Sequence, residues 1–223
     1  MAKNNKPTIR KSKIFNIPTY AQKEEFTSSA ACALMVLKYL NKNLQMNKEN
    51  EFEIWREAVS GSVWHGSRYG LAYALAKRGA KTEIITNVKD EGFEKTMAVY
   101  EGVNLDTLSA SFNEIKQKSS NLKIKETVQN VSMNKIKEQI NKNKIPIVLV
   151  DANALNPYME KAPHWVIIKG YDEDSIYLND PYSDNTVTMT QDMFKSVLGY
   201  ENNCHMILAN TRGFNPKAGK SRK

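Results

Sequence analysis

The pattern of apolar and polar positions divides the chain into a helical part and a strand-rich part. Three small hydroxyl residues at 27–29 precede a dense apolar run over 30–40. Small polar residues before an apolar run are typical of an N-cap followed by a buried helix. Amphipathic spacing and helix-favouring composition predict further helices over 51–58, 67–77, 132–141 and most of 90–125.

The C-terminal third is richer in β-branched residues and predicts a sheet. Apolar runs at 145–150 and 164–169 predict buried strands. Short strands joined by tight turns indicate an antiparallel sheet. Helices first and sheet second predict an α+β fold in one domain, 14–211, with a helical lobe over about 14–142 and a sheet lobe over about 143–211. Further short strands are expected at 81–86, 175–179, 186–189 and 205–209.

Composition places the chain among globular proteins. Of its 223 residues, 41% are hydrophobic and 25% are charged, which is neither a disordered nor a fibrous composition. No stretch reaches the ~18 consecutive apolar residues of a membrane span, and the polar, basic start lacks the apolar core of a secretory signal. Two cysteines, Cys32 and Cys204, cannot build a disulfide framework. We therefore expect a cytoplasmic protein with no membrane span.

The net charge of +8 is concentrated at the two ends of the chain. Residues 1–13 and 212–223 each contain five basic and no acidic residues, so the body between them carries a net −2. A near-neutral body with basic ends is not the basic groove of a nucleic-acid-binding domain. We expect two flexible, solvated tails. The alternative is that the tails tether the protein to an acidic partner.

His164 and Asp180 are candidates for chemistry because the predicted strands bring them together. His164 opens one apolar strand, and Asp180 comes sixteen residues later at the end of the next. When two antiparallel strands are joined by a tight turn, the start of the first lies beside the end of the second. A carboxylate beside a histidine fixes its tautomer and raises its basicity, as in hydrolase triads. A purely structural His–Asp pair is the alternative interpretation.

A set of short motifs in a fixed order makes the interpretation more specific. The motifs are Gln22, followed after five residues by Ser28 and Ser29, then Ile-Trp-Arg-Glu-Ala at 54–58, Tyr-Gly-Leu-Ala at 69–72, Pro-His-Trp-Val at 163–166 and Asn-Asp-Pro at 179–181. The chain resembles the papain-like cysteine peptidase family that removes double-glycine leader peptides from bacteriocins. It resembles still more closely a stand-alone, peptidase-like branch of that family, over about residues 15–210.

The resemblance implies a role for each matching residue. Gln22 would donate its side-chain amide to an oxyanion hole, with the backbone N–H at position 28 as the second donor. His164 would act as the general base and then as the acid for the leaving amine, and Asp180 would orient it. Position 28 would be the nucleophile at a helix N-terminus. The resemblance also implies a papain-like fold in which a cleft between the lobes takes a peptide or protein substrate.

Three further residues are expected to bind the substrate in this cleft. Ser29 follows the nucleophile position, His65 lies in a loop ahead of a helix, and Trp165 is next to the base. Trp165 also fits a packing role under His164. The histidines and cysteines do not form a zinc-ligand cluster, and the chain has no Gly-rich phosphate loop. We therefore expect no metal and no cofactor.

Ser28 departs from the family pattern, which has Cys-Gly where this chain has two serines. Four interpretations are open: a Cys replaced by Ser to give an inactive, peptide-trapping form; a natural pseudopeptidase that binds a peptide or protein; a working serine nucleophile; or Cys32 as the nucleophile. The third is disfavoured because a hydroxyl cannot form a stable anion paired with an imidazolium. The fourth is disfavoured because Cys32 lies in an apolar run and fits a buried small hydrophobe.

Overall fold

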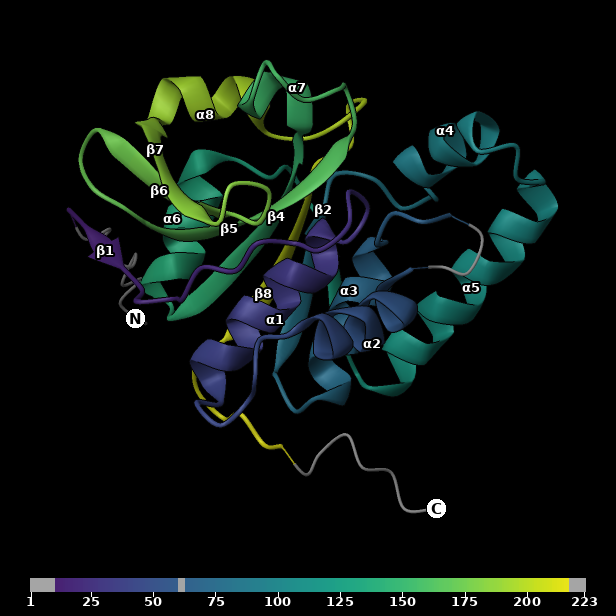
Figure 1. The fold of residues 1–223 in the computed structure, drawn as a ribbon, viewed down its shortest axis with the longest axis horizontal. Coiled ribbons are helices and arrows are strands. Elements are labelled where there is room, and N and C mark those ends of the chain that lie inside the picture. Colours follow the sequence, from purple (N-terminus) through teal and green to yellow (C-terminus); the bar gives the residue numbers. More distant parts are fainter. Residues whose placement is uncertain (1–10, 60–62, 217–223) are drawn as a thin grey trace, which may run out of the picture.

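The computed structural model describes residues 11–59 and 63–216 (Figure 1). The helices in this part of the chain are α1 (Ser28–Leu40), α2 (Lys48–Ala58), α3 (Arg68–Lys77), α4 (Phe93–Tyr100), α5 (Leu105–Asn121), α6 (Met133–Asn141), α7 (Ala152–Leu155) and α8 (Gln191–Val197). The strands are β1 (Lys13–Ile14), β2 (Thr82–Thr86), β3 (Lys125–Val128), β4 (Lys144–Asp151), β5 (Pro163–Tyr171), β6 (Ser175–Asp180), β7 (Asn185–Thr190) and β8 (His205–Asn210). Within the described residues, no helix combines the length and the apolar character needed to cross a membrane.

The strands form one eight-stranded sheet with the order β3-β2-β8-β4-β5-β6-β7, and β1 pairs with β5. β2 and β3 run parallel to each other, whereas the other neighbouring strands are antiparallel. This mixed architecture confirms the predicted α+β fold class. β2 and β3 come from the part of the chain expected to form the helical lobe, so the sheet extends across the expected boundary between residues 142 and 143.

β3, like the two-residue strand β1, is not predicted by the sequence pattern. Its residues, Lys-Glu-Thr-Val, are mostly polar, and its side chains are exposed or half-buried because it lies at the edge of the sheet. An edge strand of this composition carries little of the apolar signal that marks a buried strand. Its parallel pairing with β2 requires a long crossover, and the segment containing α4 and α5 provides it.

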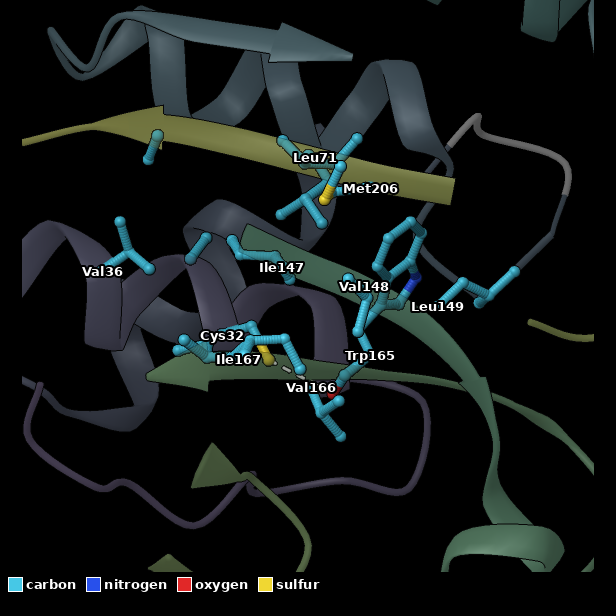
Figure 2. Close-up of a cluster of buried hydrophobic side chains, with 14 of the residues drawn as sticks. Cys32, Val36, Leu71, Ile147, Val148, Leu149, Trp165, Val166, Ile167 and Met206 are labelled. Carbon is cyan, nitrogen blue, oxygen red and sulfur yellow. Dashed lines mark hydrogen bonds between the residues drawn. The ribbon is translucent and has the colours of Figure 1, made fainter. Parts of the chain in front are cut away.

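The core lies between α1, α3 and the centre of the sheet. α1 is buried continuously from Ser28 to Leu37 and contacts β5, while α3 contacts β2 and β8. Figure 2 shows Cys32 and Val36 of α1 and Leu71 of α3 in one cluster with side chains of β4, β5 and β8. β4 and β5 are buried along almost their whole length. Strands buried on both faces read as continuous apolar runs rather than alternating ones.

The described parts of the two basic ends are attached to the fold, which corrects the expectation of solvated tails there. Lys13 pairs with Tyr171 of β5, and its Nζ donates to the backbone oxygen of Ile140 at 2.6 Å. At the other end, Asn215 N donates to Gly79 O at 2.9 Å. Strand pairing and backbone hydrogen bonds hold segments that charge alone would leave in solvent. The remaining predicted tail residues, 1–10 and 217–223, lie outside the described residues.

We expect a chain that ends at Arg212 to unfold at a lower temperature than one that ends at Pro216. The longer chain keeps Phe214 packed against the core and Asn215 bonded to Gly79. Partial burial of an aromatic ring and one hydrogen bond together contribute about 2 kcal/mol to the free energy of unfolding. Their loss should lower Tm by roughly 4–8 °C in a chain of this size. Thermal unfolding followed by circular dichroism measures the difference. Equal melting temperatures would contradict a role for this segment in stability.

Candidate active site

The centre of the candidate site is a hydrogen-bonded pair of buried side chains, His164 and Asp180. His164 Nε2 lies 2.7 Å from Asp180 Oδ1, and the two residues are 2% and 4% exposed. In the β5–β6 register, Ile167 is opposite Asn179. His164 and Asp180 are therefore diagonal neighbours on the same face of the sheet, within reach of long side chains. The pair that the sequence spacing places side by side is present in the structure.

Asp180 is fixed by a second donor. The backbone N–H of Tyr182 donates to its Oδ1 at 2.9 Å. Because Nε2 of His164 faces this carboxylate, Nδ1 is the ring nitrogen that remains to exchange a proton with a nucleophile. The arrangement supplies an oriented imidazole, which is one half of an acyl-transfer site.

Ser28 is the first residue of α1 and lies against β5 next to His164. Its Oγ accepts a hydrogen bond from the backbone N–H of Trp165 at 3.3 Å, and Trp165 directly follows His164 in the chain. β6 pairs with β5 from Ile167 onward, and the backbone N–H of Trp165 is bonded to the start of α1 instead. The structure thus brings Ser28, His164 and Asp180 together.

The N-terminus of α1 adds positive potential at this point. Thr27 is the N-cap residue but makes no side-chain cap bond. Its Oγ1 instead accepts from the backbone N–H of Glu24 at 3.2 Å, and its hydroxyl donates to the backbone oxygen of the same residue at 2.8 Å. The first amides of α1 are therefore left without a side-chain acceptor from the cap residue. Free amides and the helix dipole favour an anion at such an end. A thiolate or an oxyanion at position 28 would be stabilised there.

Gln22 lies near the same end of α1, but its amide hydrogens are already used. Its backbone N–H donates to Pro181 O at 2.8 Å, next to Asp180. Its Nε2 donates to the backbone oxygens of Glu24 and Glu25, at 2.9 and 3.0 Å. An oxyanion donor must be available to the developing charge. This role for Gln22 requires its side chain to turn, and it stays a prediction.

Glu51 is a residue that the sequence analysis missed, and it fixes the segment that carries Gln22. Its carboxylate accepts from the hydroxyl of Tyr20 and from the backbone N–H of Lys23, both at 2.9 Å, and the residue is 0% exposed. Burial, followed by the bond to Glu51, raises the pKa of Tyr20, which therefore stays a donor. The partners lie 31 and 28 residues away in sequence, so no local pattern could indicate this contact.

Cys32 is buried one helical turn inside α1. It is 0% exposed, and its thiol donates to the backbone oxygen of Trp165 at 3.2 Å. Burial, and secondarily the charge of Asp180, raises the pKa of Cys32 well above its usual value. A thiol that stays protonated and out of reach of solvent is a poor nucleophile. The structure therefore agrees with a packing role for this residue.

The three predicted substrate-binding residues differ in how far they reach the surface. Ser29 is 0% exposed and Trp165 is 1% exposed, so neither side chain is available to a peptide in this structure. Trp165 points into the core because successive strand residues face opposite sides, and its Nε1 donates to Gly66 O at 3.0 Å. His65 keeps a partly exposed side chain. Among the described residues, no cluster of three His, Cys, Asp or Glu side chains could hold a metal ion.

These features, an oriented imidazole beside a helix start in an α+β fold, define a papain-like, peptidase-type protein. Residues 17–198 match the sequence profile of a family described as the Peptidase_C39 like family, and the chain belongs to this family. A comparison with curated proteins gives no match. Among solved structures, a protein from Bacillus anthracis described as a candidate C39-like peptidase has a TM-score of 0.52 and 12% identity, over 92% of this chain and 100% of its own. At this identity the likeness shows a shared fold.

We expect Gly66→Ala to destabilise the protein and Ser29→Gly to compensate. A Cβ at position 66 would lie 2.1 Å from Ser29 Oγ and 2.5 Å from its Cβ, and such overpacking costs about 1–3 kcal/mol. Ser29→Gly removes both atoms, at a helix cost of about 0.5–1 kcal/mol on its own. Chemical denaturation of the two single variants and the double variant forms a mutant cycle. Strictly additive effects would contradict the packing of Ser29 against Gly66.

Proposed function

We propose that this chain binds a peptide at the site formed by Ser28, His164 and Asp180, and that it does not hydrolyse amides with serine at position 28. The observation that carries the proposal is the buried His164–Asp180 pair at 2.7 Å beside the start of α1. Membership of a peptidase-like family supports a peptide as the ligand. A peptide lying across this point would present its carbonyl to the first amides of α1.

The chemistry of the two possible nucleophiles explains the loss of hydrolysis. A cysteine at position 28 would form a thiolate stabilised by the helix N-terminus and by protonated His164. The thiolate would attack the amide carbonyl, His164 would give its proton to the leaving amine, and water would then release the acyl group with His164 as base. A serine hydroxyl holds its proton far more strongly, and Ser28 Oγ here accepts from Trp165 N. The first step therefore lacks its anion.

The sequence motifs favour a finer assignment within the family. Their order resembles the stand-alone branch of the bacteriocin-processing peptidases, whose substrates carry small residues before the cleaved bond. A peptide with a double-glycine step is therefore the ligand that we propose. A cytoplasmic location and contact of the basic ends with an acidic partner remain predictions of the same kind.

A natural pseudopeptidase is the second candidate, and two observations favour it. The amide of Gln22 is bound to two backbone oxygens rather than free for an oxyanion. Ser29 fills the space opposite Gly66, where the family pattern has glycine next to the nucleophile. In this case the chain would bind a peptide or protein, and restoring the nucleophile would not restore cleavage. In the first candidate, by contrast, Ser28 replaces a catalytic Cys, and restoring the Cys would restore cleavage.

We expect Ser28→Cys to create a thiol that reacts with iodoacetamide much faster than Cys32 or Cys204. The helix N-terminus stabilises the thiolate and His164 holds the proton, whereas burial raises the pKa of both existing cysteines. Mass spectrometry of the alkylated peptides measures each rate. The matched control, His164→Ala in the same background, should slow the reaction. A thiol at position 28 that reacts like free cysteine would contradict an assembled site.

Cleavage by the Ser28→Cys variant separates the two candidate functions. A fluorogenic amide of Gly-Gly is the probe. If a catalytic Cys has been replaced, the variant should cleave it, and Gln22→Ala should then lower the rate by roughly two to three orders of magnitude, the usual effect of losing one oxyanion donor. A fast-reacting thiol without cleavage of this probe would favour the pseudopeptidase. Cleavage unaffected by Gln22→Ala would contradict the predicted oxyanion role.

A further inference from the structure

Glu94 is a fully buried carboxylate that the candidate site does not use. It lies in the first turn of α4 and is 0% exposed. Among the described residues, neither of its carboxylate oxygens has a hydrogen-bond partner. A buried carboxylate without partners is costly when it is charged, so such a group keeps its proton. The closed fold therefore holds Glu94 in its neutral form.

The charged groups around Glu94 do not offset its burial. Arg68 of α3 uses its guanidinium elsewhere, because it donates to Glu126 Oε1 at 3.2 Å and to Asp90 O at 2.7 Å. The segment before α4 contributes the negative charges of Asp90 and Glu91, and α5 contributes the hydroxyl of Ser109, which donates to Glu91 at 3.0 Å. Burial raises the pKa of Glu94 from its ordinary 4.5 to about 8, against the opposing effects of Arg68 and of the backbone N–H of Glu94.

The other end of α4 is bonded to the loop that precedes α3. Glu101 directly follows α4. Its Oε2 accepts from the backbone N–H of Trp64 at 3.3 Å, and its Oε1 lies 3.4 Å from His65 Nδ1. One carboxylate at the end of α4 thus holds two successive residues of this loop.

The described part of this loop, residues 63–66, packs in turn against the start of α1. The ring of Trp64 meets the ring of Phe26 edge-on, with their centroids 4.9 Å apart, and Phe26 is two residues before Ser28. Gly66 lies so close to α1 that a Cβ there would be 2.1 Å from Ser29 Oγ. A chain of contacts therefore runs from α4 through the loop to the start of α1.

We propose that α4 is a pH-sensitive element: when Glu94 gives its proton to water, α4 separates from the fold, and Glu101 releases the loop at 63–66 beside the start of α1. The open form exposes Glu94 to solvent, where the charged carboxylate is hydrated. A rise in pH therefore favours the open form, and a fall in pH favours the closed form. The proposal concerns the conformation of the chain as it stands and does not depend on the proposed function.

The two forms release the proton of Glu94 at different pH, which fixes the sign and size of the effect. The closed form keeps the proton up to about pH 8, whereas the open form loses it near the ordinary pKa of 4.5. Between these values each pH unit raises the ratio of open to closed form about tenfold. His65 acts in the opposite direction, but only below about pH 6.5, because burial lowers its pKa from 6.5 in the closed form. The interval from pH 6.5 to 8 therefore isolates Glu94, with a rise of about thirtyfold.

Hydrogen exchange measured by NMR at the backbone amide of Glu101 reports the opening of α4, because this amide donates to Met97 O at 2.8 Å. The exchange rate divided by the rate of an unstructured amide at the same pH gives the open fraction. We expect this fraction to rise about thirtyfold from pH 6.5 to 8 in the unaltered chain, and to stay constant in Glu94→Gln, which is neutral throughout. Glu91→Gln is the matched control. Glu91 pairs with Lys95, and its pKa is lowered by hydrogen bonding, so it is charged over this whole interval and its loss should preserve the rise.

The backbone amide of Trp64, which donates to Glu101, reports the loop in the same spectra. Its open fraction should rise with that of α4 in the unaltered chain, and Glu101→Ala, which removes the acceptor, should abolish this pH dependence at Trp64. A constant open fraction of α4 between pH 6.5 and 8 in the unaltered chain would overturn the proposal, even if Glu94→Gln does not fold. An equal rise in Glu94→Gln would also overturn it, because another group would then be responsible. A Trp64 amide that does not follow α4 would overturn the release of the loop by Glu101.

Discussion

Trp165 is the residue on which the candidate site depends, because it joins the helix that carries Ser28 to the strand that carries His164. Its backbone N–H donates to Ser28 Oγ, its carbonyl accepts from the Cys32 thiol, and its indole donates to Gly66 O. A buried polar group left without a partner costs about 1–3 kcal/mol, so each bond opposes separation of these elements. The start of α1, the loop before α3 and β5 are thereby fixed around one residue, and the placement of Ser28 relative to His164 is set by packing in the core.

The Asn-Asp-Pro motif at the end of β6 also joins separate elements around the site. Asn179 Nδ2 donates to two backbone oxygens of the segment before α1, both at 3.1 Å. Asp180 binds His164, and Pro181 O accepts from the backbone N–H of Gln22. Three successive residues therefore position the segment leading to α1, the side chain of His164 and the backbone of Gln22. A short motif of this kind combines structural and chemical roles, and a change at Asn179 would reach the site through the backbone.

The sequence predicted what depends on local pattern and missed what depends on tertiary contacts. α1, β4 and β5 were predictable because their apolar runs are long and buried on most sides, whereas the polar edge strand β3 was not. The His164–Asp180 pair was predictable because a tight turn joins the two strands that carry it. The inward side of Ser29 could not be predicted, because it is set by contact with a loop distant in sequence. A packing role for Trp165 followed from its place in an apolar strand, whereas its bond to Gly66 O could not be predicted. The same holds for Gln22, whose motif indicates its place but not which carbonyls its amide binds.

Serine at position 28 changes the charge of the site more than its shape. The hydroxyl is neutral across the ordinary pH range and accepts one N–H from the strand, so α1 still meets β5. With a thiolate in its place, the helix N-terminus would hold an anion beside the imidazolium, and the partly negative oxygen of a bound carbonyl would meet that charge as well as the helix amides. With serine, the proposed peptide carbonyl would meet those amides with no competing anion. The contacts that hold His164 beside the start of α1 therefore persist with serine at position 28, whereas the anion that the proposed cleavage needs is absent, so the proposed binding and cleavage differ by one side-chain atom.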